Sequence, residues 1–427
     1  MSHAVRSVET FWVDLPLRPV PARNMQREIP HWTLFEICRV ELESGVVGFG
    51  ETMVYYTWGE PTVTDAARNR VTGKHPAENM WDDSLGAGLQ IALFDAAAKA
   101  MDAPLHQLLG QQVRDRCFIS WWDIDLPAED WISECQLARE QGYTSFKTKA
   151  RPWWDLIEQT RQLCQTLPDH FEVDMDFNGF GIDTAHCTRL CKEMEQFHHV
   201  VMFESPLPHR DVAGYRHLRR HTEIPISMHT PTHFGDPSME TCIREEMCDG
   251  FVVTGGATRI QRDGLTCQAF NKSLFLQVVG TKIAAAFGLH LGAVLEQAHW
   301  PAVNCHQLFE RDCISTELPV TNGQALVPEG PGLGIELDEE AIELYRCERK
   351  DKPYPAPDLL IAIRWPAGST TYYTHTAQFW EDWYRGRLPF FPRGVNLEHI
   401  PNDGSADWAD LRQKALEGAV HSSAPPF

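Results

Sequence analysis

The chain has 427 residues, of which 43% are hydrophobic and 23% charged, and its formal net charge is −21. This length is long for one domain and short for four, so we expect one large domain with a smaller companion. The negative charge argues against nucleic acid and anionic membrane surfaces as partners, although it leaves room for an anionic substrate. The most apolar run, residues 283–294, is too short to span a bilayer.

The twelve cysteines are scattered along the chain and form no Cys-x-x-Cys pair. Residues 1–12 contain no apolar core of the length found in signal peptides. We therefore expect a reduced, cytoplasmic protein whose thiols are mostly buried.

Residues 1–115 are predicted to form a small α+β domain. Three β-rich runs predict an antiparallel meander, and an apolar pattern at helical spacing predicts one long helix. The strands are expected at residues 7–15, 34–40 and 47–51, and the helix at residues 85–101. Two loops lie between these elements, at residues 18–30 and 52–61, and the second one carries Tyr55, Tyr56 and Trp58.

Strands and helices alternate regularly over residues 116–320. The strands are expected at residues 117–122, 144–149, 171–176, 200–204, 225–228, 250–253 and 274–278. The helices that follow them are expected at residues 129–141, 154–167, 183–197, 211–220, 234–246, 259–270 and 282–296. Seven such units, with an eighth strand near residues 303–309, favour a closed parallel barrel over a doubly wound open sheet.

The C-terminal stretch, residues 350–427, differs from the barrel. It is rich in Pro, Trp and Tyr and has no clear period, apart from a short helix expected at residues 380–385. Its many aromatic residues argue against disorder. We therefore expect it to pack over the barrel or against another subunit.

Charged side chains stand at the ends of three consecutive predicted strands. Lys147 and Lys149 end the second strand, Asp176 ends the third and Glu204 ends the fourth. Because the carboxyl ends of barrel strands share one mouth, these groups are expected to converge there. Lysines beside carboxylates suit the removal of a proton next to a carboxylate while a metal holds the resulting charge.

The two lysines are two residues apart on one strand, so they point the same way. Ammonium groups that lie close together repel each other, which predicts a lowered pKa for both Lys147 and Lys149. A lowered pKa would suit a general base. The plainer alternative is a pair of solvated lysines at a strand end.

Three motifs occur in a fixed order: Gly-Phe-Gly-Glu at residues 48–51, a helix and turn at residues 92–110, and Pro-Gly-Leu-Gly-Ile-Glu-Leu-Asp at residues 331–338. Through them the chain resembles the enolase superfamily, on the side of the mandelate racemases and muconate lactonising enzymes, over residues 5–345. The resemblance implies an α/β fold in which an N-terminal capping domain covers a modified TIM (β/α) barrel. It also implies that residues 321–349 complete the barrel and the cap.

In that superfamily a divalent metal, usually magnesium, binds the substrate carboxylate, and a base removes the α-proton. The resemblance implies that Lys149 is the base and that Lys147 polarises the carboxylate. It further implies that Asp176 and Glu204 bind the metal, and hard oxygen ligands suit magnesium. Asp174, on the same face as Asp176, is a lesser candidate.

Further expected roles concern the substrate. Asn178 completes the Asp-x-Asn motif of the third strand. The resemblance implies that the capping loop brings Tyr55 and Trp58 over the substrate. By family habit, the protein is expected to be a homo-oligomer that acts on a small-molecule carboxylate.

The chain departs from the family pattern on the opposite wall. His229 and Thr230 stand where an acidic metal ligand is expected after the fifth strand. His229 is open to three readings: a metal ligand, a general acid, or a wall of the pocket. As a ligand it would favour Mn²⁺, Zn²⁺ or Fe²⁺ over Mg²⁺. No Asp or Lys occupies the expected place on the sixth strand, and Gln277 lies where racemases of this family carry a histidine.

These departures disfavour a two-base racemase and leave one-base chemistry. We expect a metal-dependent lyase, a dehydratase of a hydroxylated carboxylate such as an acid sugar, with Lys149 as base and His229 as acid. The alternatives are a racemase, epimerase or cycloisomerase of the same superfamily, and a non-catalytic descendant that binds a carboxylate.

Overall fold

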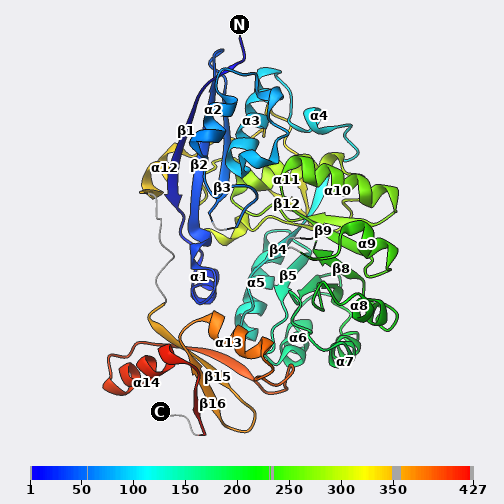
Figure 1. Cartoon of the computed structure of the whole chain (residues 1–427), viewed down its shortest axis with the longest axis vertical. Coiled ribbons are helices and arrows are strands. Elements are labelled where there is room, and N and C mark those ends of the chain that lie inside the picture. Colours follow the sequence, from blue (N-terminus) through cyan, green and yellow to red (C-terminus); the bar gives the residue numbers. More distant parts are fainter. Residues whose placement is uncertain (1, 55, 230, 232–234, 349–356, 424–427) are drawn as a thin grey trace.

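The computed structural model describes residues 2–54, 56–229, 231, 235–348 and 357–423 (Figure 1). These residues form three sheets, and Figure 1 shows them as an N-terminal part, a barrel and a C-terminal unit. The closed barrel with a capping domain that the motifs predicted is confirmed. The domain limits given above stay predictions.

The N-terminal sheet is the predicted meander with one strand added. It contains β1 (Val5–Asp14), β2 (Leu34–Leu42), β3 (Val47–Met53) and, paired with β1, β14 (Arg346–Cys347). Its helices are α1 (Pro19–Met25), α2 (Asp65–Val71), α3 (Ala87–Ala100) and α4 (His106–Leu109). Helix α3 packs so closely on β3 that a Cβ atom at Gly50 would overlap the carbonyl oxygen of Gly88. This close approach explains the glycines of the motif at residues 48–51.

The parallel barrel follows the predicted alternation. Its strands are β4 (Arg116–Trp122), β5 (Ser145–Lys149), β6 (Glu172–Asp176), β7 (Val200–Glu204), β8 (Ile226–His229), β9 (Gly250–Val253), β10 (Ser273–Leu276) and β11 (Ala302–Val303). Its helices are α5 (Ala128–Glu140), α6 (Leu156–Cys164), α7 (Thr184–Met194), α8 (Val212–Arg219), α9 (Met239–Arg244), α10 (Ala257–Ala269) and α11 (Lys282–Val294). Strand β11 pairs with β4 and Val303 bridges to Gln277, which closes the ring.

The eighth strand is shorter than predicted. It ends at Val303, and Cys305 then adopts a left-handed backbone conformation with φ 64° before a 3₁₀ turn at His306–Leu308. The predicted strand at residues 303–309 is therefore wrong beyond its first residue. A hairpin of β12 (Val320–Thr321) and β13 (Gln324–Leu326) lies antiparallel to β4, and α12 (Glu339–Tyr345) leads back to the N-terminal sheet.

Two buried carboxylates join the capping domain to the barrel side. Glu51 accepts hydrogen bonds from the backbone N–H groups of Thr281 and Ala284, at 2.7 and 3.1 Å, at the start of α11. A helix N-terminus favours an anion there, although burial raises the pKa of Glu51 to about 8. Asp95 of α3 accepts the N–H of Leu333 at 2.8 Å. Asp95 also accepts the backbone N–H of Phe49 at 2.8 Å, so this one carboxylate joins the motifs at residues 48–51 and 331–338.

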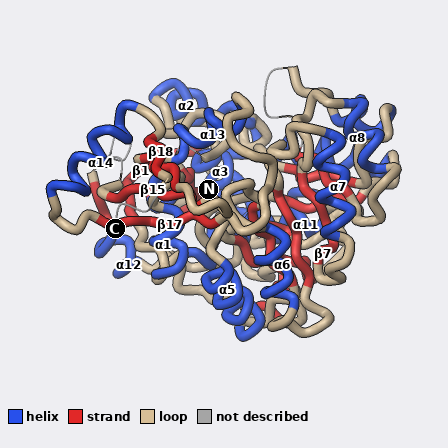
Figure 2. Tube along the Cα trace, turned by 90° about the horizontal axis from the view of Figure 1, so that it is seen from below, coloured by secondary structure: helices blue, strands red, loops and turns tan. Residues whose placement is uncertain are grey.

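The C-terminal unit, residues 357–423, contains more regular secondary structure than the one short helix that the sequence predicted. Its sheet has the order β17 (Asn396–Pro401), β15 (Leu359–Arg364), β16 (Thr370–Tyr373), β18 (Val420–Ser422), and its helices are α13 (Thr376–Tyr384) and α14 (Ala406–Glu417). Figure 2 views the protein from the side of this unit. Strands β15 and β16 are buried on nearly every residue, so they lack the alternation that reveals a half-buried strand.

The described helices are all too short or too polar to cross a lipid bilayer. Ten of the twelve cysteine side chains are buried, and all twelve are free thiols. Buried thiols were expected from the composition.

Candidate active site

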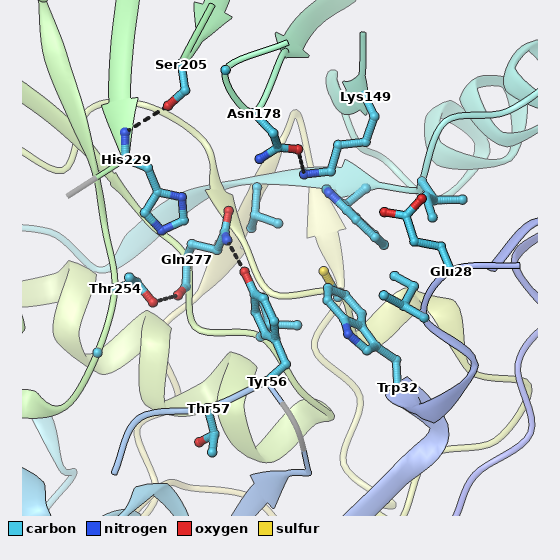
Figure 3. A pocket seen from close by; sticks show the side chains of 18 of the residues that line it. Glu28, Trp32, Tyr56, Thr57, Lys149, Asn178, Ser205, His229, Thr254 and Gln277 are labelled. Carbon is cyan, nitrogen blue, oxygen red and sulfur yellow. Dashed lines mark hydrogen bonds between the residues drawn. The ribbon is translucent and has the colours of Figure 1, made fainter. Parts of the chain in front are cut away.

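A cavity of about 1030 Å³ lies at the carboxyl ends of the barrel strands. Three parts of the chain line it, and Figure 3 shows a close view of its side chains. The barrel contributes Lys149, Asn178, Ser205, His229 and Gln277, the capping domain contributes Glu28, Trp32, Tyr56 and Trp58, and the C-terminal unit contributes Trp380 and Tyr384.

Lys147 lies at the floor of the strand ends and is only 1% exposed. Its Nζ forms an ion pair with Glu204, lies 3.6 Å from Asp176 Oδ2, and donates a hydrogen bond to Gln277 Oε1 at 2.8 Å. Burial by itself lowers the pKa of Lys147, but the charges of Glu204 and Asp176 outweigh burial, and the pKa is raised. The lowered pKa predicted for Lys147 is therefore wrong. It is a fixed cation.

Lys149 differs from Lys147 because it reaches the cavity. Its side chain is 16% exposed, and its Nζ donates to Asp176 Oδ2 at 2.5 Å. It also donates to Asn178 Oδ1 at 3.0 Å (Figure 3). Burial raises the pKa of Asp176, but the charges of Lys149 and Lys147 lower it by a larger amount, so the net shift is downward. Asp176 therefore stays ionised and holds the ammonium of Lys149. The geometry leaves Lys149 as the lysine that a substrate can reach.

The two candidate metal ligands both lie close to the Lys147 ammonium. Asp176 and Glu204 are both buried; Glu204 pairs with the Lys147 ammonium, and its Oε1 lies 3.6 Å from His229 Nδ1. Two buried carboxylates at neighbouring strand ends offer the hard oxygen donors that a divalent cation takes, and Mg²⁺ binds through one or two carboxylates completed by water and substrate. Within the described residues, no group of three His, Cys, Asp or Glu side chains is arranged to hold a metal. Asp174, the lesser candidate, has a raised pKa because of burial and then the charge of Glu204.

His229 lies at the end of β8 with its Nδ1 3.6 Å from Glu204 Oε1. Figure 3 shows its ring pointing into the cavity near Gln277. This position suits either a third ligand or an acid, so both readings stay predictions. Thr230, the neighbouring candidate, lies outside the described residues.

The wall opposite Lys149 carries an amide where a second base was considered. Gln277 accepts from Lys147 and donates from Nε2 to the hydroxyl of Tyr56 at 2.7 Å. Both ends of the amide are therefore engaged. Trp58 lines the cavity and donates from its indole N–H to Gln90 at 3.1 Å. Tyr55 lies outside the described residues, so its predicted role is untested.

Arg151 is a cavity residue that the sequence reading missed. It stands two residues after Lys149, and its buried guanidinium donates to Asn178 Oδ1 at 2.8 Å and to the carbonyl oxygen of Asp176 at 3.3 Å. Arg151 thus positions the same asparagine that holds Lys149. The alternation of Lys, Lys and Arg at residues 147, 149 and 151 was the available signal.

The C-terminal unit supplies an aromatic wall to the cavity. Trp380 packs edge-on against Phe180 at 5.0 Å between ring centroids, and the Arg151 guanidinium lies 5.7 Å from the Trp380 ring. Thr376 donates to the carbonyl oxygen of Arg27 in the capping domain at 2.8 Å. The unit therefore contacts both halves of the site. No periodic pattern in the sequence places this helix at the cavity.

Replacing Trp380 by alanine is expected to raise KM about tenfold and to change kcat less. The large indole ring forms part of the cavity wall, and its loss removes contacts that hold the substrate equally before and during the reaction. Steady-state kinetics on the best substrate would measure this split. The control is Leu416→Ala, an exposed position on α14 in the same unit. An unchanged KM in the Trp380 variant would contradict the wall assignment.

Comparisons with known proteins agree with this architecture. A family model described as enolase C-terminal domain-like matches residues 130–341. The D-galactonate dehydratase of Pectobacterium atrosepticum is 24% identical over 360 residues, which cover 73% of this chain and 90% of the relative. Muconate cycloisomerase 1 of Rhodococcus opacus is 24% identical over 383 residues, which cover 80% of this chain and 98% of the relative.

A solved structure supports the same fold. The crystal structure of muconate cycloisomerase from Pseudomonas fluorescens aligns with a TM-score of 0.66 at 20% identity, covering 82% of this chain and 100% of the other. The relatives named are all enzymes. From the barrel, the capping sheet and these matches together, it follows that the chain belongs to the enolase superfamily, on the side of the mandelate racemases and muconate lactonising enzymes.

Proposed function

We propose that the protein is a metal-dependent dehydratase that removes the α-proton of a hydroxylated carboxylate, such as an acid sugar. The observation that carries this proposal is the asymmetry of the cavity. Lys149 enters from one wall, whereas the facing position at Gln277 holds a neutral amide. Elimination of water needs one base and an acid, whereas two-base racemisation needs a base on each side.

A divalent metal fits the two carboxylates of Asp176 and Glu204. When bound, it would offset the negative charge of the substrate carboxylate and of the anion that proton removal creates. Mg²⁺ suits these oxygen donors, whereas a third ligand at His229 would favour Mn²⁺, Zn²⁺ or Fe²⁺.

The chain's own side chains would divide the remaining work. Lys149 takes the α-proton, and Asn178 and Asp176 orient its amine toward the cavity. Lys147 stays charged and adds to the positive field around the substrate carboxylate. The aromatic side chains of the capping domain and of α13 exclude water from the reacting carbons.

Cycloisomerisation is the second candidate, because it too begins or ends with one base and a carboxylate held beside it. The muconate cycloisomerase relatives favour it, as the D-galactonate dehydratase relative favours elimination. An epimerase or a non-catalytic carboxylate-binding protein are the further alternatives. The proposal includes assembly into a homo-oligomer, and its only basis is that members of this superfamily commonly form oligomers.

The test is a panel of acid sugars and other hydroxylated carboxylates incubated with the protein in heavy water, with Mg²⁺ or Mn²⁺ present. We expect at least one compound to lose water and form a 2-keto acid, detected with a carbonyl reagent and by mass spectrometry. Inversion at the α-carbon without loss of water would favour an epimerase instead. A protein that takes up no divalent metal and exchanges no α-proton would contradict the proposal.

A further inference from the structure

The loops after β7 and β8 bring a histidine, an aspartate and a serine together at the cavity, away from Lys149. His209 Nδ1 lies 3.4 Å from Asp236 Oδ2, and His209 Nε2 lies 3.0 Å from Ser205 Oγ. All three residues line the cavity. Figure 3 shows Ser205 above His229, across the cavity from Lys149.

The hydrogen-bond partners assign the protons on this group. A carboxylate only accepts, so the Nδ1–H of His209 points to Asp236. The Nε2 atom then accepts from the Ser205 hydroxyl, whose oxygen in turn accepts the backbone N–H of His229 at 3.3 Å. A carboxylate that fixes one ring nitrogen leaves the other available for proton transfer.

The serine is a less suitable reactive group than the histidine. Ser205 is 1% exposed, its backbone adopts a left-handed conformation with φ 44°, and its oxygen is engaged on both sides. The His209 side chain is more accessible, at 17% exposed. The arrangement therefore favours proton transfer through the imidazole over nucleophilic attack by the serine.

We propose that His209, oriented by Asp236, is the general acid that protonates the departing hydroxyl group. This inference rests on the proposed elimination and adds the residue that completes it. His229 is the competing histidine, but its Nδ1 faces Glu204, a candidate metal ligand. His209 instead has a carboxylate of its own. Asp236 also lies 3.7 Å from the guanidinium of Arg210, so its charge is shared.

The step balances in protons and electrons. Lys149, as the amine, takes the α-proton, and the C–H electron pair stays on the substrate. That pair forms the double bond as the β-carbon–oxygen bond breaks. His209 enters this step protonated on both ring nitrogens; its Nε2 proton passes to the departing oxygen, which leaves as water, and the neutral ring keeps its proton on Nδ1. The enol product rearranges to a 2-keto acid. Lys149 then releases one proton to solvent and His209 takes one up.

The surroundings allow His209 to give up its proton readily. Burial lowers the pKa of His209, and the charge of Asp236 partly opposes this effect. His229 lowers the pKa further, and Glu204 raises it. A lowered pKa makes the protonated ring a stronger acid, so it gives up its proton more readily.

The first test compares His209→Gln with His217→Gln, an exposed histidine on α8 that serves as the control. For the substrate found with the panel, we expect loss of water to fall about 10²–10⁴-fold in the His209 variant only. Deuterium should still enter the unreacted substrate, because Lys149 is intact. A β-fluoro analogue should restore elimination, since fluoride leaves without needing the acid.

Two kinetic outcomes would overturn the inference. One is loss of water from the hydroxyl substrate at the control rate. The other is an equal fall of deuterium exchange and elimination with no recovery on the fluoro analogue. If instead the wild-type protein exchanges no proton on any compound, the proposed function fails, and this result is separate from both outcomes.

The second test needs no substrate. With ¹⁵N-labelled histidine, and the His209→Gln spectrum to assign the signals, wild-type His209 is expected to carry its proton on Nδ1. Asp236→Asn should shift this preference and lower kcat with little change in KM. A wild-type His209 protonated on Nε2 alone would contradict the inference whatever the substrate.

Discussion

Replacing Lys149 by methionine is expected to lower α-proton exchange and turnover by about 10²–10⁴-fold, the usual contribution of a positioned general base. Of the two lysines on β5, Lys149 is the one whose side chain reaches the cavity, and its Nζ donates hydrogen bonds to Asp176 and Asn178. Methionine keeps the aliphatic stem and removes the amine. Exchange of the substrate α-proton in heavy water, followed by NMR, measures the effect.

Lys192→Met is the matched control for this variant, because Lys192 is a half-exposed lysine on α7, outside the cavity lining, whose ion pair is with Glu195. The control should exchange at the wild-type rate. The Lys149 variant should retain its thermal midpoint within a few degrees, so that a loss of exchange reports chemistry and not unfolding. Exchange that survives in the Lys149 variant would remove this residue from the role of base.

The Lys149 side of the site could be predicted from the sequence, because strand register fixes which of its residues are neighbours. Lys149 pairs in register with Asp176, and Asp176 pairs in register with Glu204, so the three lie side by side on adjacent parallel strands. Period-two alternation and strand ends are local signals. The positions of these residues near three strand ends were therefore enough to predict that their side chains lie together.

The side of the cavity opposite Lys149 could not be predicted in the same way. His209 and Asp236 lie in two loops about 27 residues apart in sequence, and their meeting depends on loop conformations that no short pattern specifies. Trp380 comes from a unit whose buried strands lack alternation. Its place at the cavity depends on packing against Phe180 and Arg151.

The pKa predicted for Lys147 failed for a physical reason. Repulsion between two ammonium groups was weighed without the carboxylates, which are nearer. Each lysine has its own acidic partner, Glu204 for Lys147 and Asp176 for Lys149. In a buried setting, opposite charges in direct contact outweigh a like charge farther away. The pair thus separates into a fixed cation and an accessible amine.

The fixed cation leads to a second large effect. Lys147→Met is expected to lower the free energy of unfolding by about 3–5 kcal/mol, because it leaves the buried carboxylates of Glu204 and Asp176 without their cation. Saturating Mg²⁺ should restore part of this loss, since a divalent cation bound to the same carboxylates replaces the missing charge. Chemical denaturation with and without Mg²⁺ measures both effects.

Lys99→Met separates the metal effect from the simple loss of a buried ion pair. Lys99 pairs with the buried Asp95 in the capping helix α3, and neither residue lines the cavity. Both variants should lose stability, but Mg²⁺ should stabilise only the Lys147 variant more than it stabilises the wild type. Equal stabilisation of all three proteins would contradict metal binding by Asp176 and Glu204.

The stability of the Lys147 variant should also depend on pH in a defined direction. In the wild type the folded-state pKa of Asp176 is lowered by Lys149 and Lys147 against the effect of burial, so its stabilisation is present above the unfolded-state pKa of about 4 and is lost in stronger acid. Removing Lys147 raises that folded-state pKa and weakens the stabilisation. The deficit relative to wild type should therefore be full at pH 7 and shrink as the pH falls toward 4, where the carboxylates take up protons. A deficit that stayed constant from pH 7 to pH 4 would show that Lys147 stabilises the barrel by packing and not by its charge.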